Sequence, residues 1–153
     1  MGMIGSYLRV TPDELKKAIA DEGWLFARMD ESGGGRSLDV DKAWHAIGFL
    51  LERVDFPVNV VFDGEAFGAD NGYGQPRYLT PERVRAASEA LAKTGFDELL
   101  IGVGQDDLTR AEVYPGIWDE PEALDYVRGH YEPLVEFFAA AALDGDAVLL
   151  WLD

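Results

Sequence analysis

The chain has 153 residues, a length that fits a single domain over residues 1–153 with a hydrophobic core of its own. Hydrophobic residues make up 48% of it and the mean hydropathy is −0.10, as in soluble globular proteins. No apolar run approaches the roughly 20 residues that a membrane-spanning helix needs. The first ten residues, MGMIGSYLRV, also lack the basic and apolar regions of a signal peptide. The composition therefore predicts a cytoplasmic protein.

Cysteine content and charge narrow the function classes further. The chain has no cysteine, which excludes disulfides, thiolate catalysis and zinc sites built on sulfur. It carries 29 acidic and 13 basic residues, for a formal net charge of −16. Nucleic-acid phosphates and anionic lipids repel such a chain, whereas a basic protein is attracted to it. We therefore expect no nucleic acid and no membrane among its partners, and no cofactor; the charge favours a basic protein.

A strand and then a helix are expected at the start of the chain. Apolar residues alternate along residues 3–10, as in a half-buried strand. Thr11 and Glu14 then form a capping box, with Pro12 at the first helical position. A short helix therefore begins after Thr11, and Gly23 is its expected end.

The segment LDVDKAWHAIGFLL, residues 38–51, follows a glycine-rich loop at residues 31–37 and has the periodicity of a helix. Its apolar residues recur at three- and four-residue spacing and define a core-facing stripe: Val40, Trp44, Ile47, Leu51 and Val54. Residues 57–62 fit either a short strand or a further helical turn. A second glycine-rich loop at 64–76 leads to a second Thr-Pro helix start at Thr80.

The last third of the chain predicts a long helix and a final strand. Residues 99–104 fit a strand or an irregular connection, and Asp119 is the expected cap of the helix. Pro133 is expected to kink or break this helix, because its ring clashes with the carbonyl of Gly129. The run AVLLWL, residues 147–152, suits a strand buried on both faces. These elements predict an α+β fold: a single compact domain whose small sheet, with strands near both termini, packs against several helices.

Asp41 and His45 are the first candidates for chemistry. They lie four residues apart, so on a helix they share one face. A carboxylate at that spacing can orient an imidazole, whose ordinary pKa of about 6.5 suits acid–base work near neutral pH. The pair lacks the third ligand or the nucleophile of a metal or covalent site, so no metal is expected. The alternative is structural, since Asp39 and Asp41 lie where acids stabilise a helix N-terminus.

Two further groups of residues allow two interpretations each. Arg77, near the helix N-terminus at Thr80, can hold an anion there, or the loop is only a set of turns pinned by Tyr73. Tyr114 and Trp118 are residue types that anchor protein interfaces, and they lie in an acidic segment with a single basic residue. Its nine acids are Asp97, Glu98, Asp106, Asp107, Glu112, Asp119, Glu120, Glu122 and Asp125. They form either a contiguous negative patch or an ordinary solvated face.

Five blocks of the sequence, taken together, point to a family: MGMIGSYLRV, LDVDKAWHAIGFLL, NGYGQPRYLTPERV, VYPGIWD and AVLLWL. In order and spacing they resemble the YfbM-like family of bacterial proteins over nearly the whole chain. The resemblance implies a compact α+β domain and brings no established activity. This chain has Gly48 where many members of the family have a second histidine, which argues against a histidine-pair metal site.

Three functions stay open at this point. The leading hypothesis is a binding module without catalysis, for example an immunity-like antagonist of a basic toxin or enzyme. The second is a small-molecule or metal-assisted enzyme, whose pocket gathers Arg77 and the three catalytic candidates Asp41, His45 and Tyr114. In the third, these residues only stabilise the fold. The candidate binding residues are Asp39, Lys42, Trp44, Tyr73, Arg77, Trp118 and Asp119.

Overall fold

The first and last strands of the chain lie side by side at the centre of the sheet. A computed structural model of the chain pairs β1 (Gly5–Val10) with β5 (Ala147–Leu152) antiparallel along their whole length. On one side β1 pairs with β2 (Ser37–Asp39), and on the other β5 pairs with β4 (Arg77–Leu79), which pairs with β3 (Glu65–Ala66). Within the described part of the chain the order is therefore β2-β1-β5-β4-β3, antiparallel throughout. The structure describes residues 2–21, 23–24, 27 and 36–153.

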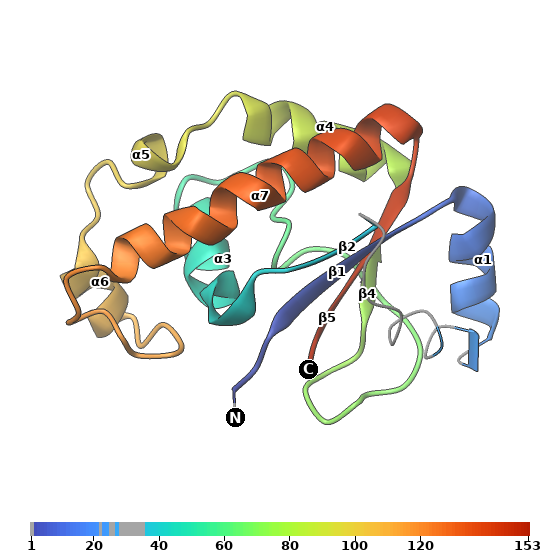
Figure 1. The fold of residues 1–153 in the computed structure, drawn as a ribbon, viewed down its shortest axis with the longest axis horizontal. Helices are drawn as coiled ribbons and strands as arrows, with labels where there is room; N and C mark the ends of the chain where they lie inside the picture. The colour runs from blue at the N-terminus through green and yellow to red at the C-terminus, as the bar shows by residue number, and fades with distance from the viewer. Residues whose placement is uncertain (1, 22, 25–26, 28–35) are drawn as a thin grey trace.

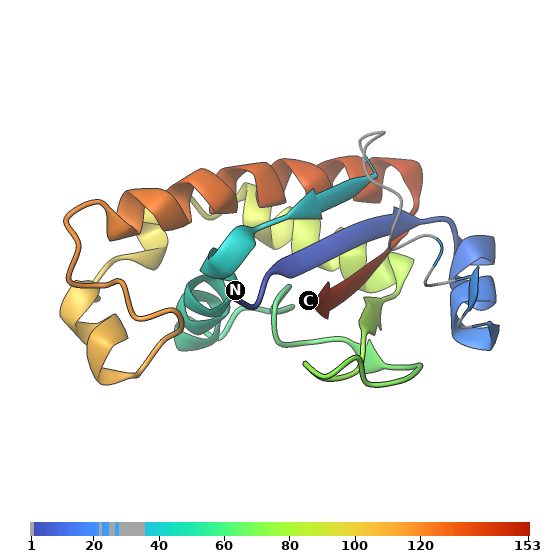
Figure 2. The same ribbon diagram turned by 60° about the horizontal axis from the view of Figure 1, so that its bottom comes forward.

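Helices cover the sheet unequally. One face packs against α3 (Trp44–Arg53), α4 (Pro81–Ala92) and α7 (Ala123–Asp144), and the other face against α1 (Pro12–Ala20). Figures 1 and 2 show α7 running along the sheet, with α1 at one end of the molecule and α6 (Gln105–Arg110) at the other. None of the described helices is long and apolar enough to cross a membrane. The predicted α+β fold is confirmed.

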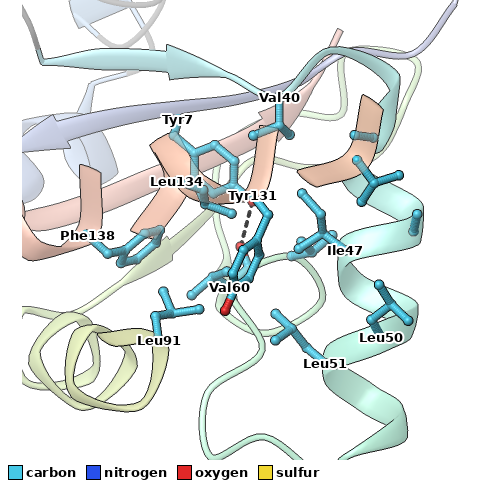
Figure 3. Close-up of a cluster of buried hydrophobic side chains, with 14 of the residues drawn as sticks. Tyr7, Val40, Ile47, Leu50, Leu51, Val60, Leu91, Tyr131, Leu134 and Phe138 are labelled. Carbon is cyan, nitrogen blue, oxygen red and sulfur yellow. Dashed lines mark hydrogen bonds between the residues drawn. The ribbon is translucent and has the colours of Figure 1, made fainter. Parts of the chain in front are cut away.

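The alternation of side chains along β1 and β5 separates two hydrophobic clusters. Tyr7 and Leu150 face the large core under α7, whereas Leu8 and Leu149 face the smaller cluster under α1. Figure 3 shows the large core, in which α3, α4 and α7 meet Tyr7 and its hydroxyl donates to the carbonyl of Val60 at 2.8 Å. The prediction that AVLLWL is a strand buried on both faces is confirmed.

Both predicted Thr-Pro helix starts are confirmed. Thr11 and Glu14 form the reciprocal capping box of α1, with N–H to oxygen distances of 2.9 and 3.1 Å. Thr80 accepts the backbone N–H of Arg83 at the start of α4 at 3.4 Å. The end of α1 differs from the prediction, because the helix stops at Ala20 and Asp21 is already extended.

The long helix α7 differs from the prediction at two residues. It runs without interruption through Pro133, because Pro133 and Gly129 both lie on its exposed side. The Gly129 carbonyl that loses its helical donor is therefore on the solvent side, where a missing hydrogen bond costs little because water can replace it. Asp119 does not cap the helix: Glu122 is the N-cap residue and makes no side-chain cap bond. Asp119 lies instead in the exposed turn before it.

The segment 38–51 is not one helix. Leu38 and Asp39 belong to β2, and a 3₁₀ turn (η1, Asp41–Ala43) precedes α3. The backbone of Asp41 has φ 48°, outside the right-handed helical region, so a helix cannot start before it. The predicted stripe holds for Val40, Ile47 and Leu51, which are fully buried, but not for Val54. Of the preceding loop predicted at 31–37, residues 31–35 lie outside the described residues.

The ambiguous segment 57–62 is a turn organised by the buried side chain of Asn59. Its Nδ2 donates to the Gly48 carbonyl of α3 at 3.0 Å, and its Oδ1 accepts the backbone N–H groups of Val61 and Phe62, each at 3.0 Å. Asn59 is one of only two buried polar residues in the described chain. Because these hydrogen bonds hold the backbone in a turn, the segment forms neither a strand nor a helix.

We predict that Asn59→Ala lowers the free energy of unfolding by about 2 kcal/mol, because it leaves two backbone N–H groups without an acceptor and removes the second donor of the Gly48 carbonyl. Urea unfolding followed by circular dichroism measures this change. The control is Asn71→Ala, which removes two exposed bonds, one to the Leu152 carbonyl and one from the Tyr73 N–H, and is expected to cost less than about 1 kcal/mol because water can replace both. Equal losses in both variants would contradict the role of Asn59.

Candidate functional site

A cluster of aromatic rings joins the start of α3 to the N-terminal segment and to the turn after α6. The indole N–H of Trp44 donates to the Met3 carbonyl, and the Met3 N–H donates to the Tyr114 hydroxyl, both at 2.9 Å. The backbone N–H of Tyr114 donates to Nδ1 of His45, also at 2.9 Å. The Trp44 ring stacks on His45 and on Tyr114, with centroids 5.2 and 5.7 Å apart. The N-terminal segment, the start of α3 and the turn after α6 are far apart in sequence, and these contacts hold them together.

These contacts determine the protonation state of His45. Because Nδ1 accepts a hydrogen bond from a backbone N–H, the neutral ring must carry its hydrogen on Nε2. Partial burial lowers the pKa of His45, so the ring is neutral at pH 7. Among the described residues Nε2 has no partner, and it is not one of the buried unpaired atoms. His45 therefore presents an uncharged N–H donor to solvent.

Next to His45 lies a hollow of about 450 Å³, which we call the histidine hollow. One wall is a face of α3, since His45, Phe49 and Glu52 follow one another at helical spacing. Phe62 and Val113 also line the hollow. The complete lining is His45, Phe49, Glu52, Arg53, Phe62, Ala111 and Val113.

Phe62 occupies the space above Gly48. A Cβ atom at residue 48 would lie 2.6 Å from Cζ of Phe62, so a side chain there requires this ring to move. The edge of the same ring meets His45, at 6.1 Å between centroids and 70° between planes. Phe62 therefore occupies the space that a side chain at residue 48 would need.

A second hollow, of about 570 Å³, is lined by the turn after α6; we call it the acidic hollow. Its lining residues are Thr109, Glu112, Val113, Tyr114, Pro115, Gly116, Trp118 and Asp119. Trp118 is only 2% exposed, and its indole N–H donates to the Val113 carbonyl at 2.8 Å. The ring of this candidate binding residue therefore belongs to the core and reaches the surface only in the lining of the acidic hollow.

Glu112, in the lining of the acidic hollow, has a strained backbone conformation. Its φ of 54° is in the left-handed region, which costs an L-residue other than glycine roughly 1–2 kcal/mol. The side chain of Glu112 is exposed and lines the acidic hollow. Such strain persists only where the surrounding structure enforces it, as is common at binding and catalytic sites.

The acidic residues of the segment 97–125 are exposed, with the exception of the half-buried Asp107. They lie on α5 (Phe96–Leu99), α6 and the turns that lead into α7, which Figure 1 shows together at one end of the molecule. Asp97 pairs with Arg128 and Asp107 with Arg110, each at 2.5 Å. Seven of the nine acids have no ion pair within the described chain. This end, with the acidic hollow, is strongly negative.

Asp41 faces α7 rather than His45. Its Oδ2 accepts the hydroxyl of Tyr126 at 2.8 Å, and that hydroxyl oxygen accepts the backbone N–H of Lys42 at 3.0 Å. Burial, and then the bond to Asp41, raise the pKa of Tyr126 to about 12, so the phenol stays a donor. Asp39 accepts the N–H of Asp41 at 3.1 Å. These candidate residues stabilise the junction of β2, η1 and α7.

Arg77 and Tyr73 line neither hollow. The guanidinium of Arg77 donates to the carbonyls of Asp63 and Val61, at 2.9 and 2.5 Å, and so fixes the turn that follows Asn59. Tyr73 is 51% exposed on its loop. Arg77 therefore has backbone partners in place of an anion.

The structure brings together two of the four residues of the predicted pocket, His45 and Tyr114. Among the described residues, no three histidine, aspartate or glutamate side chains are grouped closely enough to hold a metal ion. Sequence analysis missed Phe49, Glu52 and Phe62 of the histidine hollow. Phe49 and Glu52 can be found from the helical spacing after His45, but Phe62 has no signal in the sequence.

Comparisons with known proteins place the chain in a family without assigning an activity. A family model described as a domain of unknown function (DUF1877) matches residues 1–151, which confirms the resemblance seen in the sequence blocks. The chain is also similar to the crystal structure of YfbM from Escherichia coli, a protein of unknown function, with 17% identity and a TM-score of 0.74. This match covers 98% of this chain and 99% of that chain, and it shows the fold alone. No curated protein matches the chain.

We predict that His45 makes the protein less stable in mild acid. Its folded pKa lies below the ordinary value of 6.5, so its contribution is complete above pH 6.5 and is lost as the pH falls through the folded pKa. His45→Gln keeps an oxygen acceptor for the Tyr114 N–H but does not titrate. The wild-type unfolding free energy is therefore expected to fall more steeply than that of the variant below pH 6.5, in urea titrations at several pH values.

The pH range in which His45 affects stability lies above the range in which the carboxylates titrate. The hydrogen bond from Arg36 is the main reason that the pKa of Glu14 falls from 4.5 to about 2, so its contribution is lost only below pH 4.5. Parallel pH profiles of the wild type and His45→Gln above pH 5 would contradict the assigned state of His45.

Glu112→Gly is expected to raise the free energy of unfolding by about 1 kcal/mol, because glycine adopts the left-handed backbone without strain. Glu112→Ala is the control: it removes the same carboxylate and keeps the strain, so it should leave stability nearly unchanged. Thermal unfolding of both variants provides the comparison. A glycine variant no more stable than the alanine variant would show that the conformation stores no strain.

Proposed function

We propose a binding function for this chain, which belongs to the DUF1877 family, a domain of unknown function. The chain is a module that holds a basic protein against its acidic end. An immunity-like antagonist of a basic toxin or enzyme is the specific form of this function. The acidic hollow is the observation that carries the proposal.

The lining of the acidic hollow matches a lysine or arginine side chain. Glu112 and Asp119 supply carboxylates, while Tyr114, Pro115 and Trp118 supply apolar and aromatic surface. Long cationic side chains have an apolar stem and a charged head, and the head is also attracted to aromatic rings. A single basic side chain therefore finds partners for both of its parts in this hollow.

The surrounding charge supports recognition at longer range. Seven acids of the segment 97–125 have no ion pair in the described chain, and the whole chain has a net charge of −16. Such a field accelerates the association of a positively charged partner and repels acidic proteins. Because exposed charges are screened by salt, binding of this kind weakens as ionic strength rises.

The contacts of the other candidate residues favour binding over catalysis. Asp41 is bonded to Tyr126 and Arg77 to two backbone carbonyls, so neither is available to activate a substrate beside His45. His45 itself has Nδ1 occupied and a hydrogen on Nε2, which makes it a donor and not a base at neutral pH.

The test is to capture a partner from a lysate of the organism that encodes the chain, and then to measure its affinity by calorimetry. We expect a basic protein whose dissociation constant rises at least about tenfold between 50 and 300 mM salt. The double variant Glu112→Gln with Asp119→Asn should weaken binding by about tenfold at low salt, since each lost ion pair is worth up to about 1 kcal/mol.

A matched double variant controls for net charge. Asp13→Asn with Glu89→Gln removes two exposed carboxylates from α1 and α4 and should change the dissociation constant by less than about threefold. Equal weakening by both double variants would show that only total charge matters and would reject the acidic hollow as the contact. An affinity that does not depend on salt would contradict the proposal as a whole.

A further inference from the structure

We infer that the histidine hollow is a second and separate binding site, which takes a small neutral aromatic molecule with a carbonyl group. This inference does not depend on the proposed protein-binding function, because the two hollows are lined by different residues. They share only Val113.

The polar group of this site is Nε2–H of His45. Three neighbours hold the ring: the Tyr114 N–H at Nδ1, the stacked face of Trp44 and the edge of Phe62. A donor that is already oriented and has no partner among the described residues gains a hydrogen bond when a ligand supplies an acceptor. The complementary group is an oxygen such as a carbonyl.

The apolar part of the site consists of two phenylalanine rings. Phe49 lies one helical turn after His45, and Phe62 belongs to the turn organised by Asn59; both rings line the hollow. Phe62 is 38% exposed, unusual for so large an apolar side chain, and a ligand in the hollow would cover it. A volume of about 450 Å³ is in the range of small-molecule sites, and two rings favour a flat aromatic body.

Charge decides between neutral and ionised ligands. Glu52 lies on the rim of the hollow, and the chain carries a net charge of −16, so an anion is repelled. The positive charge of Arg53 is already directed at the carbonyls of Leu99 and Ile101, at 3.4 and 2.6 Å. A cation would meet the N–H of His45, which is a donor. A neutral carbonyl compound accepts the hydrogen bond of His45, is not repelled by Glu52 and does not need the charge of Arg53.

The test uses benzamide as the neutral probe and benzoate as its charged analogue of the same shape. Each is titrated into the ¹⁵N-labelled protein and followed by amide chemical shifts. Benzamide is expected to shift the signals of Phe49, Phe62 and Val113 in a saturable way, with a dissociation constant in the millimolar range, about what so small a ligand can reach. Benzoate should bind at least about fivefold more weakly.

Two variants of His45 distinguish the contribution of its hydrogen bond to benzamide binding from the contribution of its ring shape. His45→Gln keeps an acceptor for Tyr114 and offers an amide N–H in place of Nε2–H, so benzamide affinity should stay within about threefold. His45→Phe keeps a ring but loses both polar atoms, and should bind at least about fivefold more weakly. The amide spectrum of each variant shows whether the fold is intact, and His45→Gln keeps the inference testable if His45→Phe does not fold.

The double variant Glu112→Gln with Asp119→Asn should bind benzamide like the wild type, which separates this site from the acidic hollow. Three results would overturn the inference: no saturable shifts in the wild type, equal affinity for benzoate and benzamide, or unchanged benzamide affinity in a folded His45→Phe. Failure of the partner capture leaves these results unaffected, so the two proposals can fail independently.

Discussion

The pairing of β1 with β5 is the constraint on which the rest of the molecule depends. It joins the two ends of the chain, and reciprocal backbone bonds between Ile4 and Asp153, at 2.8 and 3.0 Å, extend it beyond the strands. It also holds Met3 where its backbone meets Trp44 and Tyr114. The geometry around His45 therefore depends on a contact between the first and last residues of the fold, which forms only when the chain ends have come together.

The two hollows share one short segment, and this arrangement explains why polar and strained groups gather there. Tyr114 donates its N–H to His45 on one side and lines the acidic hollow on the other. Glu112, two residues before it, holds a carboxylate in the lining despite its left-handed backbone. Unpaired acids crowded at one end of a protein also reduce its stability through repulsion. Costs of this kind are typical of surfaces kept for binding rather than for folding.

Local chemistry was predictable from the sequence, and tertiary partners were not. The helix starts at Thr11 and Thr80 and the strand AVLLWL depend on neighbouring residues, so they were predicted correctly. Of the kink or break predicted at Pro133, the break does not occur, because the effect of a proline depends on which side of the helix faces solvent. At the candidate site, the helical spacing of Asp41 and His45 suggested a pair. The positive φ of Asp41 and the distant Tyr126 gave it another partner, and neither is visible in the sequence.

The central claim is that His45 is neutral, with Nδ1 accepting the Tyr114 N–H and the hydrogen on Nε2. Long-range ¹H–¹⁵N correlation of the imidazole at pH 7.5 tests it directly, because protonated and unprotonated ring nitrogens resonate at well-separated frequencies. We predict one unprotonated nitrogen, assigned to Nδ1, and one protonated nitrogen, assigned to Nε2. A hydrogen on Nδ1, or two protonated nitrogens, would contradict the contact that fixes Tyr114 between the two hollows.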